Sequence, residues 1–188
     1  MDAPALNHLL RTMAAVAPSR RVLVRGTDVE KNDTEKTGVE KEAGGHVSSA
    51  LAQMGFEVHA APWTDDEARQ VHRAAAEGEA PAVYTTGAPV GALPYPEAHF
   101  AWVIVQVPRP DEAAEALRRR ADLRALLAEA RRHVRPGGWV FVLAPAAVAP
   151  DALDEVAAQA ALAEAEAPER DGRRVRGIYR RVEEETAP

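Results

Sequence analysis

The sequence predicts an α/β fold in which a mostly parallel sheet carries helices on both faces. A helical pattern ends at Pro136-Gly137-Gly138, and the hydrophobic strand 139–144 follows at once, which is the local pattern of an α/β sheet. Helical and strand patterns alternate along most of the chain, as in parallel sheets. Two strand patterns in succession, at 162–167 and 174–182, indicate a closing hairpin and therefore one antiparallel strand.

The first elements are a helix and a short strand. Apolar residues at helical spacing predict a helix over 3–17, which Pro18 stops. The strand covers 21–25, and Gly26 ends it.

A charged segment, 27–43, separates this strand from the next helix. A connection from strand to helix usually takes about 2–6 residues. We therefore expect 27–43 to be either a lid over a site or a disordered insert.

Two helices and two strands follow. Gly44-Gly45 opens a helix that we expect to turn Met54 inward and to stop at Gly55. A capping box, Thr64 to Glu67, starts the second helix. The strands are expected at 56–61 and, more weakly, at 82–86.

The second half of the chain continues the alternation. A loop rich in glycine and proline, 87–97, leads directly into a strong central strand at 99–107, so one helix is missing at this point. A long helix is predicted over 111–134, with Val134 on its apolar face, and another at about 151–161.

Composition limits the classes of protein to be considered. The length of 188 residues suggests one domain over 1–188, with the N-terminal helix inside 1–19 and a tail at 183–188. The net charge of −6 argues against a nucleic-acid partner. No apolar run approaches the ~20 residues that span a bilayer, and no signal peptide is visible, so we expect a cytoplasmic protein without a membrane partner. The oligomeric state is open.

Three segments resemble one known family. Gly87-Ala88-Pro89 with Leu93 to Val105 is similar to the pattern "GDA…LPFPDASFDVVV", and Leu127 to Gly138 is similar to "LxExxRVLKPGG". A partial match runs from Val22 to Val58. The chain thus resembles a class I S-adenosylmethionine-dependent methyltransferase of the small-molecule type often labelled type 11. The resemblance covers about 20–182 and implies a Rossmann-like, three-layer sandwich with a seven-stranded sheet whose last strand is reversed.

The family binds S-adenosylmethionine with acidic residues and a glycine-rich turn. Carboxylates suit its ammonium group and ribose hydroxyls, and glycine lets the backbone approach closely. The four expected acids align here with Val24, with Pro62 or Trp63, with Ala88 and with Ala101. A slip in this alignment would let Asp28, Asp65 or Asp66 supply one contact each.

The candidate cofactor residues follow from the resemblance and from the ends of the predicted strands. They are Gly26, Thr27, Gly44, Gly45, Trp63, Gly87, Ala88 and Gln106. Trp63 could stack on an adenine or belong in part to the core. His46, at a helix start, and Arg109, after the fourth strand, are weaker candidates. The histidines match no metal motif, so no metal is expected, and no catalytic residue can be named.

Two functions remain open. The first is an S-adenosylmethionine-dependent methyltransferase that acts on an unknown small molecule. The second is a non-catalytic relative that has lost the usual cofactor binding and serves as a binding or assembly module. A nicotinamide-dinucleotide protein is disfavoured because no G-x-G-x-x-G follows the first strand.

Overall fold

The computed structural model describes residues 12–13, 19–26, 47–77, 83–107, 123–171 and 174–182. Most of the helix predicted at 3–17, the charged segment 27–43, Gly44-Gly45 and the start of the long helix at 111–134 lie outside the described residues. In chain order the described elements are β1 (Arg21–Arg25), α2 (Val47–Gln53), β2 (Glu57–Ala61), α3 (Asp65–Glu77), β3 (Val83–Thr85), β4 (Phe100–Gln106), α4 (Leu123–His133), β5 (Val134–Pro145), α5 (Pro150–Gln159), β6 (Leu162–Asp171) and β7 (Arg174–Arg181).

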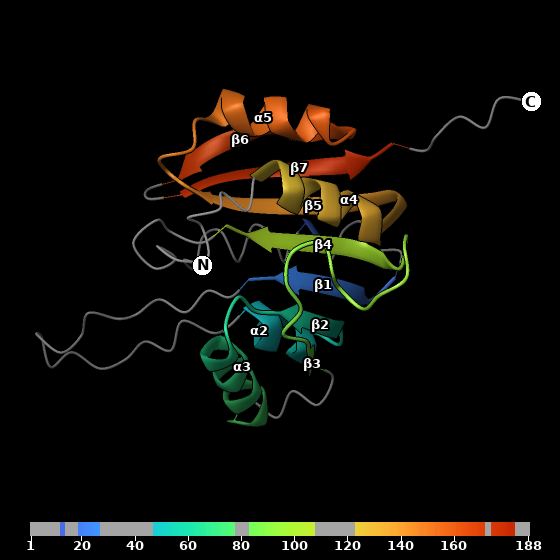
Figure 1. Ribbon diagram of the computed structural model, residues 1–188, viewed down its shortest axis with the longest axis vertical. Coiled ribbons are helices and arrows are strands. Elements are labelled where there is room, and N and C mark those ends of the chain that lie inside the picture. Colours follow the sequence, from blue (N-terminus) through green and yellow to red (C-terminus); the bar gives the residue numbers. More distant parts are fainter. Residues whose placement is uncertain are drawn as a thin grey trace, which may run out of the picture.

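The described strands form one seven-stranded sheet in the order β3-β2-β1-β4-β5-β7-β6. The pairs from β3 through β5 are parallel. Strand β7 is antiparallel to both of its neighbours, β5 and β6, so it alone runs against the rest (Figure 1). The predicted mostly parallel sheet with a reversed last strand is confirmed.

The sheet separates two hydrophobic cores. Leu23 packs with Leu126 and Leu127 of α4 and Leu153 of α5 on one face. The alternate β1 residues, Val22 and Val24, pack with Val47 and Leu51 of α2 and with Met13 on the other. Alternation along a strand sends successive side chains to opposite faces. Helices therefore cover both faces, and the predicted three-layer sandwich is confirmed (Figure 1).

The predicted boundary between the long helix and the next strand is wrong. Helix α4 ends at His133, and β5 begins at Val134 rather than at Trp139. Val134 is fully buried and pairs with Phe100, and the register then shifts before Trp102 pairs with Trp139. Pro136-Gly137-Gly138 thus forms an irregularity inside β5, where Gly137 adopts a φ of +69° and absorbs the extra residues.

The prediction that Met54 points inward is also wrong, because its side chain is 41% exposed. Helix α2 ends at Gln53, and Met54 lies on the turn that Gly55 completes with a φ of +84°. That turn confirms Gly55 as the helix stop.

The connection between β3 and β4, residues 86–99, contains no helix in the structure, as the sequence predicts. It crosses the face of the sheet on which α4 lies (Figure 1). Within the described ranges, no helix is long and apolar enough to cross a membrane.

Candidate cofactor site

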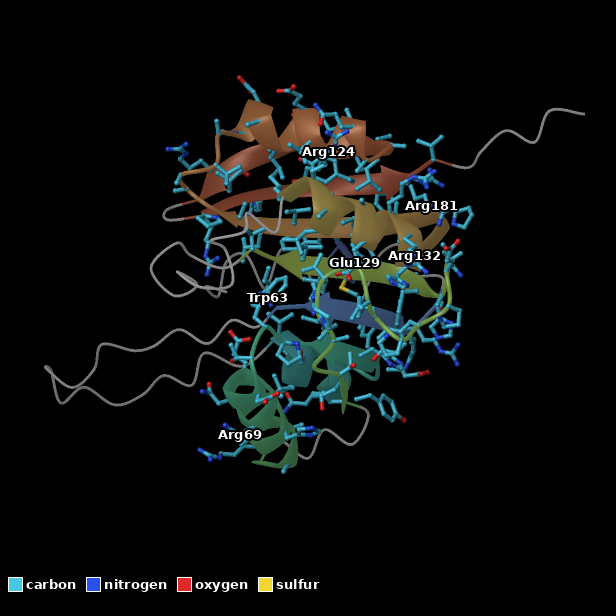
Figure 2. The ribbon with its side chains drawn as sticks, in the orientation of Figure 1. Trp63, Arg69, Arg124, Glu129, Arg132 and Arg181 are labelled. Carbon is cyan, nitrogen blue, oxygen red and sulfur yellow. The ribbon has the colours of Figure 1, made fainter. Side chains whose placement is uncertain are left out.

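The strand order reverses around β1, which lies between β2 and β4. In open parallel sheets, ligands bind at such a point, outside the carboxyl ends of the strands. Three of the predicted residues are at these ends: Gly26 follows β1, Trp63 follows β2, and Gln106 closes β4. Figure 2 shows Trp63 at this edge of the sheet.

Gly26, Trp63 and Gln106 are in direct contact. The indole Nε1 of Trp63 donates a hydrogen bond to the backbone oxygen of Gln106 at 3.3 Å. A Cβ atom on Gly26 would overlap both the Trp63 indole nitrogen and, at 2.5 Å, the Gln106 oxygen. Gly26 also has a φ of +85°, a backbone conformation that residues other than glycine rarely adopt. Glycine here allows the indole to lie directly against the backbone.

Arg25, the last residue of β1, is a site residue that the sequence reasoning missed. Its Nη1 donates to the backbone oxygens of Ala61 at 3.2 Å and Ala88 at 3.0 Å. Its Cζ lies 4.4 Å from the centroid of the Trp63 ring, which is the geometry of a cation–π contact. Alternation along the strand could have indicated this position. Side chains two residues apart share a face, so Arg25 lies on the same face as Leu23, which packs against α4.

Glu129 of α4 is the partner of the buried guanidinium. Its Oε2 lies 3.2 Å from Arg25 Nε, and each side chain is only 3% exposed. Burial lowers the pKa of Arg25 from its ordinary value, and the charge of Glu129 opposes that shift. The second carboxylate oxygen of Glu129 accepts a hydrogen bond from the backbone nitrogen of Gly91 at 2.6 Å. Glu129 therefore links β1 to the connection between β3 and β4.

The start of α3 fixes the backbone of Trp63. The backbone nitrogen of Glu67 donates a hydrogen bond to Thr64 Oγ1 at 3.2 Å. In return, the backbone nitrogen of Thr64 donates a hydrogen bond to Glu67 Oε2 at 3.1 Å. This reciprocal pair is the predicted capping box. Glu67 Oε2 accepts a further bond from the backbone nitrogen of Trp63 at 2.6 Å, so its carboxylate is engaged in holding the chain.

The remaining predicted residues fall into two groups. Ala88 reaches the site through its backbone oxygen, and Gly87 lies beside Asp65, whose Oδ1 would be 3.7 Å from a Cβ on Gly87. The others lie outside the described residues: Thr27, Asp28, Gly44, Gly45, His46 and Arg109.

Comparisons with known proteins identify the fold. No family model matches the chain, and no curated protein matches it in sequence. Solved structures do match. A geranyl diphosphate methyltransferase in complex with GPP and sinefungin superposes with a TM-score of 0.67 at 14% identity, over 96% of this chain and 78% of that one. The 1,6-didemethyltoxoflavin-N1-methyltransferase of Burkholderia thailandensis, with bound 1,6-didemethyltoxoflavin and S-adenosylhomocysteine, gives 0.62 at 15% identity over the same shares.

The chain has the class I methyltransferase fold. The seven strands of the sheet and the reversed last strand agree with the resemblance seen in the sequence. The [4+2]-cyclase SpnF is also similar, with a TM-score of 0.57 at 17% identity over 86% of this chain and 57% of that one. This fold therefore occurs both in methyltransferases and in a [4+2]-cyclase, so the function has to be argued from the site.

The described residues of this methyltransferase fold do not fit S-adenosylmethionine in the arrangement seen. Close approach to Gly26 is the feature a cofactor would use, but the Trp63 indole lies there. The cofactor is cationic, and the nearest buried charge is a guanidinium that Glu129 already neutralises. Of the four positions where acids were expected, Val24 and Ala101 are buried among apolar side chains. A cofactor could reach Gly26 only after the indole has moved.

Proposed function

We propose that the chain is an S-adenosylmethionine-dependent methyltransferase that acts on a small molecule. The observation that carries the proposal is the position of Gly26. It stands with positive φ at the end of β1, where the strand order of a methyltransferase fold reverses. A glycine at this point lets the backbone approach a ligand closely.

The similar structures support the choice of cofactor. Sinefungin is bound in one of them and S-adenosylhomocysteine in another. Both molecules share the adenosyl group of S-adenosylmethionine. Methyl transfer depends mostly on holding a nucleophile in line with the sulfonium, so the fold needs no dedicated acid or base to support this chemistry.

Titration calorimetry with S-adenosylmethionine tests the proposal without knowledge of the methyl acceptor. A dissociation constant tighter than about 1 mM, roughly −4 kcal/mol, is expected. Binding weaker than that would contradict the proposal, because the cofactor would not occupy the site at ordinary concentrations.

A specific observation favours a second candidate, a non-catalytic binding or assembly module. The Arg25, Glu129 and Trp63 side chains form hydrogen bonds, an ion pair and a ring contact with each other and with the surrounding backbone. Because these side chains already contact one another and the backbone, the site does not depend on a ligand for its stability. Failure of the calorimetric test, in a protein that is folded, is the result this second candidate predicts.

A cytoplasmic location and a small-molecule partner, rather than nucleic acid, remain predictions from the sequence. The acidic net charge of −6 supports the second of these.

A further inference from the structure

We draw no further inference here: the strongest candidate, the arginine-rich edge of the sheet where β1 begins and β7 ends, carries nothing because its Arg21, Arg132 and Arg181 side chains are already bound to glutamates or backbone oxygens of this chain, and nothing in the described residues shows a partner for that edge.

Discussion

The Arg25 guanidinium and the Glu129 carboxylate form an ion pair that is almost completely shielded from water. One group closes β1 and the other belongs to α4, so the pair joins the centre of the sheet to a covering helix. Through Gly91, Glu129 also holds the connection between β3 and β4.

Glu129→Ala removes the partner of a buried charge and the acceptor of the Gly91 N–H. The free energy of unfolding is expected to fall by about 3–5 kcal/mol, the usual cost of breaking a buried pair on one side. Urea denaturation measures it. Arg132→Ala breaks the exposed pair with Glu97 and should cost only about 0–1 kcal/mol. Equal losses in the two variants would show that the Arg25 pair is not effectively buried.

Gly26→Ala should destabilise the protein more than Gly91→Ala. The two glycines have nearly the same φ, +85° and +84°, so the backbone strain of the substitution is matched. A Cβ on Gly26 meets the Trp63 indole and the Gln106 oxygen, whereas one on Gly91 meets nothing within 4 Å. The difference should be about 1–3 kcal/mol, typical of overpacking, and thermal denaturation of both variants measures it. Losses of the same size would place the indole away from Gly26.

Gly138→Ala tests the irregularity inside β5. A Cβ there would lie 2.9 Å from the backbone oxygens of Ala101 and Arg135, neither of which can turn away as a side chain can. We expect a loss of about 1–3 kcal/mol in the free energy of unfolding. An unchanged denaturation midpoint would mean that β5 starts beyond Gly138, as the sequence pattern first suggested.

We expect the free energy of unfolding to fall in mildly acidic solution because of His99. Burial lowers its pKa below the ordinary value of 6.5, and the positive charges of Arg21 and His59 lower it further. As the pH falls below 6.5, the unfolded chain takes up the proton before the folded one does, so stability falls. His99→Gln should flatten the curve of stability against pH between 6.5 and the lowered pKa. An identical slope in the variant would assign the loss to other groups.

The sequence predicted the layers of the fold because its strands and helices carry strong periodic patterns. The apolar run Val22-Leu23-Val24 is typical of a buried strand, and the strand from Phe100 onward has no polar residue before Gln106. These local patterns, together with the handedness of parallel connections, restrict the topology. The boundary at Val134 could not be predicted this way, since pairing with Phe100 depends on a residue more than thirty positions away.

The candidate site was predicted in part. Gly26, Trp63 and Gln106 could be brought together from the ends of adjacent strands, and the structure places them in contact. Strand alternation places Arg25 on the same face as Leu23, but it does not identify the partner of its guanidinium. A charged residue at a strand end is usually solvated, and only the position of Glu129 on α4 turns it into a buried ion pair.

The central claim is that an adenosyl ligand binds at the carboxyl end of β1, beside Gly26 and Trp63. The chain has three tryptophans, so its NMR spectrum should contain three indole N–H signals, which substitution can assign to Trp63, Trp102 and Trp139. Titration with S-adenosylhomocysteine should move the Trp63 signal, because this indole lies against Gly26, and should leave the other two unchanged. If the Trp63 signal stays fixed up to 1 mM ligand, the claim is contradicted.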